Sequence, residues 1–261
     1  MKPSKLAFGS LTVSPLQCDF SPNQAAELFC YALEQGINLF DTAELYRNYH
    51  QFHAFLQQVK RRDVVLSTKC YAYDTEGAKR SLDKALTEMN TDYIDFFLLH
   101  EQESEHTLRG HAQAIDYFLE AKAQGLIRRF GISTHFVAGV QAAIKDLRIE
   151  VVHPIINLTG LGIADGNRED MEHALKDLRQ TDKFIYAMKA LGGGHLLKNY
   201  EAALSYALSL DVDAIAIGMQ SFEEIERNIQ AFHGTISQEP VTKRRQLVID
   251  EWCIGCRACE T

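Results

Sequence analysis

Eight short runs of apolar and β-branched residues recur along the chain, and most of them are nearly continuous in apolar residues. They begin at Leu6, Ile37, Val64, Tyr93, Leu126, Val151, Lys183 and Val212. Continuous apolar character is typical of strands that are buried on both faces of a parallel sheet. The runs start about 30 residues apart, which is the size of one strand–helix–strand unit. The repeat therefore predicts a chain built from alternating strands and helices.

The segments between the runs carry helix signals. Ser21 and Gln24 have the spacing of a capping box, with proline at the first helical position, and Gly36 stands where that helix should end. Ser221 and Glu224 have the same spacing and open the last helix. Alternating strands and helices in eight units match a closed (β/α)8 barrel of about 250 residues.

An open, doubly wound sheet is the rival architecture. Such a sheet normally carries a glycine-rich fingerprint after its first strand, and none follows the first run, Leu6–Val13. We therefore expect an α/β fold with a (β/α)8 TIM barrel over residues 1–233. Residues 234–261 are expected to form a linker and a short cysteine-rich tail, because the apolar periodicity stops there.

Charge and hydropathy exclude several classes of function. The chain has 27 Lys and Arg against 35 Asp and Glu, a formal charge of −8, and it has no long basic run, so nucleic acid is not an expected partner. Nothing in it approaches the roughly 18 apolar residues of a membrane span. The N-terminus also lacks the continuous apolar segment of a secretion signal. We expect a cytoplasmic protein.

Four chemically active residues follow the predicted strands, at the end where barrel enzymes carry their sites. They are Asp41, Tyr46, Lys69 and His100. A lysine ammonium near a phenol favours the phenolate and lowers the pKa of the tyrosine, and an aspartate holds the lysine charged. Tyr46 could then give a proton to a carbonyl oxygen that His100 orients.

Each of these residues also has an ordinary structural role. An aspartate after a strand is often a helix N-cap, and a lone histidine is more often a hydrogen-bonded structural residue. Lys69 could instead be the Schiff-base nucleophile of an aldolase-like barrel. Position at a strand end does not decide between these roles.

The set of four resembles a known family. The segment GINLFDTAELY, which ends at Tyr46, resembles the signature of the aldo-keto reductases, in which the aspartate and the tyrosine are catalytic. STK ending at Lys69 and DYIDFFLLH ending at His100 resemble the lysine and histidine segments of that family, and similar segments extend over most of residues 6–233. The resemblance implies a (β/α)8 barrel and a nicotinamide-dependent oxidoreductase that acts on a small carbonyl or alcohol substrate. It makes Tyr46 the proton donor, tuned by Lys69 and Asp41.

The resemblance also implies where NADP(H) or NAD(H) would bind. The expected contacts are Ser133, Thr134 and His153 for the nicotinamide amide, Met188 for its ring, Lys189 and Gly192 for the pyrophosphate, and Asn228 for adenine. Thr134 stands where the family has asparagine, and His153 stands where many members have glutamine.

The expected site of the 2′-phosphate departs most from the family. Gly218, Met219 and Glu224 stand where many members place lysine, serine and arginine, and Ser221 lies between them. A carboxylate repels a phosphate, so the usual preference for NADPH is weakened. Glu224 could instead only complete the capping box with Ser221. The sequence leaves open both NADH and a loss of nucleotide binding.

The tail carries Cys253, Cys256 and Cys259 at three-residue spacing. This pattern resembles the first half of a bacterial ferredoxin motif and implies a [4Fe–4S] cluster, with a zinc site as the alternative. A cubane normally takes four ligands, and the fourth is left open among Cys18, Cys30, Cys70, another subunit and a further C-terminal segment. A cluster here would imply a redox partner protein. A second hypothesis follows, in which the barrel is a non-catalytic scaffold and the tail serves electron transfer or redox sensing.

Overall fold

The computed structural model describes residues 1–235, and within them eight parallel strands close into a barrel in chain order. The strands are β1 (Leu6–Gly9), β2 (Leu39–Asp41), β3 (Val65–Cys70), β4 (Ile94–Leu99), β5 (Ile127–Thr134), β6 (Val151–Pro154), β7 (Phe184–Ala187) and β8 (Ala214–Gly218). Each strand pairs with the next one, and β8 pairs with β1. The predicted (β/α)8 barrel is confirmed.

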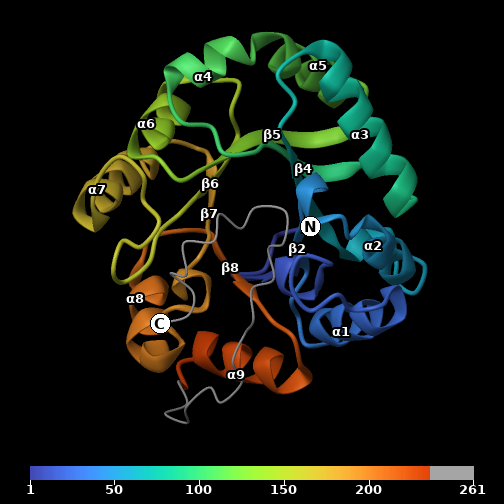
Figure 1. Ribbon diagram of the computed structural model, residues 1–261, viewed down its shortest axis with the longest axis vertical. Helices are drawn as coiled ribbons and strands as arrows, with labels where there is room; N and C mark the ends of the chain where they lie inside the picture. Colours follow the sequence, from blue (N-terminus) through green and yellow to red (C-terminus); the bar gives the residue numbers. More distant parts are fainter. Residues whose placement is uncertain (236–261) are drawn as a thin grey trace, which may run out of the picture.

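Helices form the outer layer and surround the strands (Figure 1). They are α1 (Pro22–Glu34), α2 (Tyr49–Leu56), α3 (Thr75–Met89), α4 (Glu105–Gly110), α5 (Ala112–Ala123), α6 (Val137–Lys145), α7 (Arg168–Leu178), α8 (Tyr200–Ser209) and α9 (Phe222–Phe232). The larger core cluster lies between the strands and these helices. A second cluster fills the inside of the barrel and consists of Ala7, Leu39, Val65, Phe96, Leu98, Val151, Tyr186, Ala214 and Ala216.

The helix signals read from the sequence hold. The Ser21 hydroxyl accepts the N–H of Gln24, and the Gln24 side chain accepts the N–H of Ser21, which completes the capping box of α1. Gly36 follows that helix with a φ of +92°, a conformation that glycine adopts without steric cost. Ser221 is the N-cap of α9. Local signals therefore set these helix ends.

The first apolar run was expected to be a strand over Leu6–Val13, and only its first half is one. β1 ends at Gly9, and Ser10–Val13 form the 3-10 turn η1. The Ser14 hydroxyl donates to the carbonyl of Leu11 at 2.7 Å, and the Thr12 hydroxyl lies 3.3 Å from the carbonyl of Gly9 and 3.1 Å from that of Met219. Such side-chain bonds to nearby backbone carbonyls compete with the sheet, so the chain turns here over the barrel mouth.

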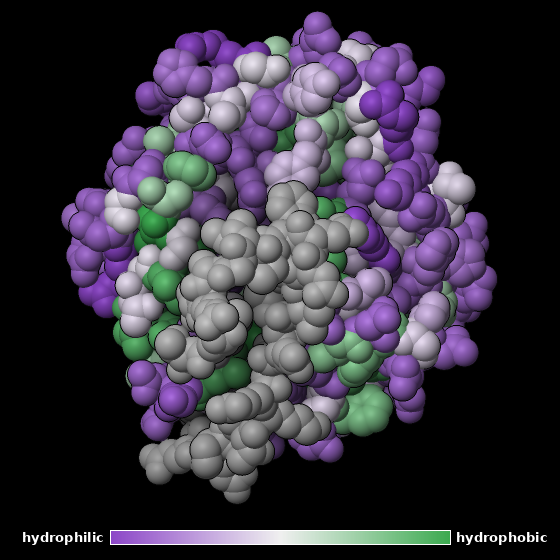
Figure 2. Space-filling view, in the orientation of Figure 1, coloured by the Kyte–Doolittle hydropathy of each residue, from purple (hydrophilic) through white to green (hydrophobic). Residues whose placement is uncertain are grey.

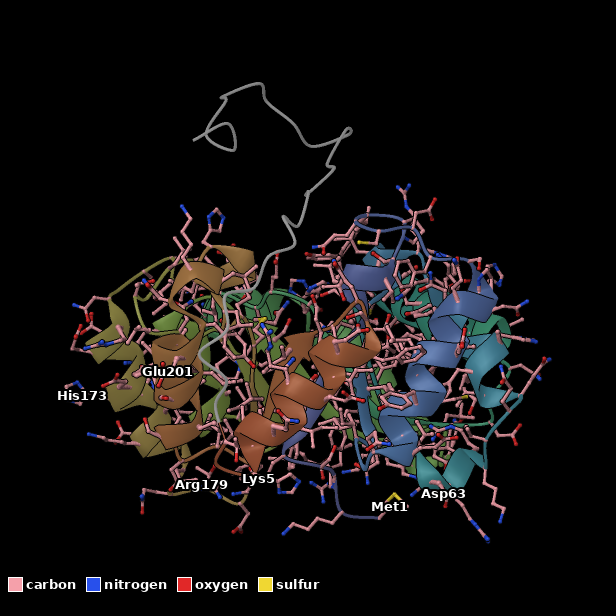
Figure 3. The ribbon with its side chains drawn as sticks, turned by 90° about the horizontal axis from the view of Figure 1, so that it is seen from below. Met1, Lys5, Asp63, His173, Arg179 and Glu201 are labelled. Carbon is pink, nitrogen blue, oxygen red and sulfur yellow. The ribbon has the colours of Figure 1, made fainter. Side chains whose placement is uncertain are left out.

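The two ends of the barrel differ in what they carry. Figure 3 shows Met1, Lys5, Asp63 and Arg179 at one end of the molecule, and Lys5 and Asp63 lie just before β1 and β3. The carboxyl ends of the strands therefore open at the opposite face, where barrel sites are built. In Figure 2 the surface over the outer helices is mostly hydrophilic, and hydrophobic residues lie nearer the centre of the view.

No helix within residues 1–235 is long and apolar enough to cross a membrane. Cys253, Cys256 and Cys259 lie outside the described residues. The expected division at residues 233 and 234 therefore stays a prediction.

Candidate active site

A buried ion pair forms the floor of the site. The Lys69 ammonium, on β3, donates to both carboxylate oxygens of Asp41, at the end of β2, with Nζ–O distances of 2.8 and 2.7 Å. Lys69 is 1% exposed and Asp41 is 4% exposed. The Lys69 ammonium also donates to the carbonyl of Thr42 at 2.8 Å. Burial lowers the pKa of Lys69, and the charge and hydrogen bonds of Asp41 oppose that shift.

Tyr46 lies beside this pair, at the end of the short 3-10 turn η2 (Glu44–Tyr46). The Lys69 ammonium is 5.3 Å from the centre of the Tyr46 ring. We expected Lys69 to lower the pKa of the phenol, but burial, followed by the charge of Asp41, raises it well above its ordinary value. Burial outweighs the nearby ammonium, whose three N–H groups are directed to Asp41 and Thr42. Tyr46 is thus a neutral phenol, which is the form that can donate a proton.

His100 follows β4 and lies against Tyr46, with ring centres 6.3 Å apart. Burial, with the charge of Lys69 as the next cause, holds the pKa of His100 well below its ordinary value, so the imidazole is neutral. Its Nδ1 is buried and has no hydrogen-bond partner among residues 1–235. The exposed Tyr71 stacks on the same ring at 4.5 Å. His100 is therefore held in place by packing and keeps hydrogen-bonding capacity.

An open cavity adjoins this group and leads along the carboxyl ends of β1, β6, β7 and β8. Its empty volume is about 910 Å³, including the part open to solvent. The lining residues are Gly9, Leu11, Thr12, Gln17, Asp41, Tyr46, His153, Met188, Lys189, Ala190, Leu191, Gly193, Gly194, Ala216, Ile217 and Gly218. The structure thus brings two of the four predicted catalytic residues to one cavity with four of the predicted cofactor contacts.

His153 forms part of the cavity wall near the ion pair. Its Nδ1 lies 2.5 Å from the carbonyl oxygen of Tyr186. A carbonyl only accepts, so the proton of the neutral imidazole is on Nδ1 and Nε2 carries a lone pair. Burial lowers the pKa of His153 to about 4. The ring therefore offers an acceptor to a ligand in the cavity, as the amide oxygen of a glutamine would.

The segment after β7 is a tight, glycine-rich turn beside the cavity. Lys189 has a φ of +59°, and Gly192, Gly193 and Gly194 have φ values of +57°, +66° and +103°. Glycine adopts this left-handed region without strain, and the N–H groups of Gly192 and Gly194 close the turn by donating to the carbonyls of Lys189 and Leu191 at 2.7 and 2.9 Å. Lys189, Gly193 and Gly194 line the cavity, whereas Gly192 is buried behind them. Met188 lies at the start of this loop, also against the cavity.

Ser133 and Thr134 are both buried at the end of β5, outside the cavity lining. The Ser133 hydroxyl accepts the N–H of Glu101 at 3.0 Å. The Thr134 hydroxyl accepts the N–H of Phe136 at 2.9 Å and lies against Gly139 of α6, on the helix side of the strand. Their side chains hold the β4 and β5 loops in the structure.

The expected adenine end is internally bonded. Asn228 is buried, donates to the carbonyl of Glu224 at 2.8 Å and accepts from the Tyr200 hydroxyl at 2.9 Å. The Glu224 carboxylate accepts the N–H of Gln220 at 2.8 Å, and Ser221 accepts the N–H of Glu224. The second bond of the capping box expected between Ser221 and Glu224 is therefore different: the Glu224 carboxylate accepts the N–H of Gln220 and not that of Ser221.

The β8 end of the cavity is closely packed. Met219 is fully buried. Gly218 lines the cavity, and a Cβ at that position would overlap the side chain of Thr12. A longer side chain at residue 218 would therefore force η1 to move.

Sequence reasoning missed several residues of the site. Gln17 and Thr12 line the cavity because the first run turns into η1 instead of continuing as a strand. Tyr186 lies under Asp41 and donates to it at 3.0 Å. The available signal was a tyrosine inside an apolar run, since a buried phenol needs a hydrogen-bond partner. Within residues 1–235 there is no group of three or more His, Cys, Asp or Glu side chains placed to hold a metal ion.

Comparison with known proteins gives one consistent family. The model of the aldo/keto reductase family matches residues 5–202. Among curated proteins, the uncharacterized oxidoreductase YqkF of Bacillus subtilis is 27% identical, over 88% of this chain and 91% of that protein. L-galactose dehydrogenase of Arabidopsis thaliana is 23% identical, over 88% and 85%. The holo form of aldo-keto reductase AKR11C1 from Bacillus halodurans shares the fold, with a TM-score of 0.73, 22% identity and coverage of 90% and 88%.

Proposed function

Because the chain belongs to the aldo/keto reductase family, and is thus an NAD(P)H-dependent oxidoreductase, we propose that it reduces a small carbonyl compound to an alcohol with Tyr46 as the proton donor. The observation that carries this proposal is the buried pair of Asp41 and Lys69 beside a neutral Tyr46, with His100 against the phenol ring. Tyr46 and His100, which can each bond a carbonyl oxygen, thus lie together at the mouth of the barrel.

The chain's residues would act as follows. His100, which is neutral, donates a hydrogen bond to the carbonyl oxygen and fixes its direction. The hydride for the carbonyl carbon would come from a nicotinamide bound in the cavity. As charge develops on the oxygen, Tyr46 transfers its phenolic proton to it. The Lys69 ammonium, held by Asp41, stabilises the phenolate that remains. The reverse direction oxidises an alcohol through the same groups.

The nicotinamide end of the cofactor fits the cavity. His153 offers a lone pair to the amide, Met188 offers an apolar face to the ring, and Lys189 offers a cation to the pyrophosphate. The region expected to hold a 2′-phosphate fits less well. The segment 218–224 contains no Lys or Arg and ends in two glutamates. We therefore propose NAD(H) as the preferred cofactor.

The experiment that tests this proposal is a titration of the anaerobically purified chain with NADH and, separately, with NADPH. Binding is measured from the fluorescence of the nucleotide. We expect saturable binding of NADH and at least roughly tenfold weaker binding of NADPH, because a phosphate would face Glu223 and Glu224. Equal binding of both would refute the cofactor preference. Binding of neither would refute the reductase and favour the scaffold hypothesis.

The substrate class follows from the mouth and from the named relatives. The mouth carries the exposed Tyr71 and Tyr73, and Tyr71 donates to Glu101 at 2.8 Å. An acidic group and two phenols suit a neutral, hydroxylated substrate better than an anion. L-galactose dehydrogenase, 23% identical, is named for a substrate of that kind. We infer that small hydroxylated aldehydes or ketones are the substrates to test first.

The tail is a separate proposal. Cys253, Cys256 and Cys259 have the spacing of ligands to a [4Fe–4S] cluster, which would couple the reductase to a redox partner protein. Of the other cysteines, Cys70 is buried in β3, Cys30 is partly buried in α1, and Cys18 is exposed in the loop after η1. Cys18 is therefore the better intramolecular candidate for a fourth ligand. Iron and acid-labile sulfide analysis of anaerobic protein tests the cluster, and a stoichiometry near zero would refute it.

A further inference from the structure

Tyr186 is a polar residue at the centre of the barrel interior. It lies on β7, is fully buried and belongs to the interior cluster, which is otherwise apolar. Because the strands close in chain order, β7 lies across the barrel from β3, and its tyrosine reaches the far side. There its hydroxyl contacts Ser67 of β3 at 2.7 Å and Asp41 of β2 at 3.0 Å. A buried phenol that crosses a barrel to reach the ion pair calls for an explanation beyond packing.

The directions of these two hydrogen bonds follow from the chemistry of the groups. The Asp41 carboxylate only accepts, so the phenol of Tyr186 donates its one proton to it. Ser67 must then donate to the phenol oxygen. The result is two bonds aligned from Ser67 through Tyr186 to Asp41, which also accepts from the Lys69 ammonium. Bonds aligned in one direction strengthen one another in a buried site.

The same residue also holds the other side of the cavity. The His153 ring stacks on the Tyr186 ring at 3.8 Å with an interplanar angle of 14°, and its Nδ1 bonds the Tyr186 carbonyl. Tyr186 therefore contacts both the ion pair below the proton donor and the histidine that faces the expected nicotinamide. None of the steps proposed above uses it.

We propose that Tyr186 is a positioning residue, whose hydroxyl orients the Asp41 carboxylate so that Lys69 stays charged beneath Tyr46. This inference rests on the proposed reductase function for its effect on turnover. Its physical basis does not depend on that function. Asp41 supports the ammonium of the buried Lys69 through charge and through two hydrogen bonds, and both depend on how the carboxylate is turned.

The charge state of Lys69 is the quantity to follow. The groups that face it or act on it are Asp41 from β2, Tyr46 from η2, His100 and Glu101 from the β4 loop, His153 from β6 and Tyr186 from β7. Asp41 is the carboxylate in direct contact with the Lys69 ammonium. The two nearby histidines, His100 and His153, are neutral and add no charge beside it. A carboxylate that is less well oriented raises the pKa of Lys69 less. The pKa of Lys69 should therefore fall when the Tyr186 hydroxyl is removed.

The test compares Tyr186→Phe with Tyr49→Phe. Phenylalanine at residue 186 keeps the ring on which His153 stacks and removes only the hydroxyl. Tyr49 is a matched control, because its phenol is also buried and bonds a single hydroxyl, that of Thr68, at 2.8 Å. Two readouts are needed: steady-state kinetics across pH with NADH and a small aldehyde, and NMR titration of the labelled Lys69 side chain in the whole chain, which needs no turnover.

We expect Tyr186→Phe to lower kcat by roughly tenfold, the equivalent of one hydrogen bond to a charged group, with KM and nucleotide Kd within about twofold of the wild type. The Lys69 titration and the alkaline limb of the kcat profile should both move to lower pH. Tyr49→Phe should change neither. An unmoved Lys69 titration in Tyr186→Phe overturns the inference, as does the same shift in both variants. A wild-type chain without turnover refutes the reductase instead, and the Lys69 titration still decides this inference.

Discussion

Replacement of Lys69 by methionine probes the ion pair on which the site is built. Asp41 accepts hydrogen bonds from Lys69 at both oxygens and from Tyr186 at one. In Lys69→Met the Asp41 carboxylate, which is 4% exposed, loses both bonds from the ammonium and keeps the bond from the Tyr186 hydroxyl. Removing one member of a buried pair costs about 3–5 kcal/mol, because the other charge stays buried without compensation. In a chain of this size, that corresponds to a fall of roughly 10 °C in Tm.

The double variant Asp41→Asn with Lys69→Met separates this cost from simple loss of packing. It removes both charges, so much of the stability lost in Lys69→Met should return. The assay is urea unfolding of the wild type, the two single variants and the double variant, followed by circular dichroism. A loss below about 1 kcal/mol in Lys69→Met, or single effects that simply add in the double variant, would refute the reasoning.

Three further predictions follow from other parts of the molecule. The pKa of buried His153 is about 4 against an ordinary 6.5. Between these two pH values the unfolded chain holds a proton on residue 153, whereas the folded chain does not. The free energy of unfolding should therefore fall by about 3 kcal/mol as the pH falls through this range. His153→Gln should reduce this slope in urea unfolding at pH 7 and pH 4.5, and an unchanged slope contradicts it. Gly131→Ala should prevent normal folding, because its Cβ would overlap the carbonyl of Val151, whereas Gly110→Ala meets no atom within 4 Å and should leave Tm nearly unchanged. Glu224→Arg should raise the affinity for NADPH by roughly tenfold relative to NADH, and a ratio that stays the same in nucleotide titrations would count against the cofactor preference.

The sequence was sufficient for the fold because each strand signal is local. Each of the eight apolar runs contains a strand, and the capping box at Ser21 marks the start of α1. The run from Leu6 to Val13 failed at its second half, where hydroxyl groups that bond nearby carbonyls compete with the sheet. Such competition depends on geometry that an apolar pattern does not contain.

The proximity of three of the expected catalytic residues was predictable, because each of them lies at or next to the carboxyl end of a strand. Asp41, Lys69 and His100 lie at the ends of consecutive strands, so parallel topology alone brings them together. The pKa direction of Tyr46 was not predictable, because it depends chiefly on how deeply the folded chain buries the phenol. Contacts across the barrel, such as that of Tyr186 with Asp41, join residues 145 positions apart. A tyrosine inside an apolar run signals that the phenol needs a partner but does not identify the partner.

Turnover of Tyr46→Phe tests the central claim most directly. The variant keeps the ring that lies beside Lys69 and removes the one proton that the proposed reaction transfers. With NADH and a small hydroxylated aldehyde, we predict that kcat falls by at least roughly a hundredfold while the Kd for NADH stays within about twofold. A kcat within about tenfold of the wild type, with the nucleotide still bound, would contradict the account, because another group would then supply the proton.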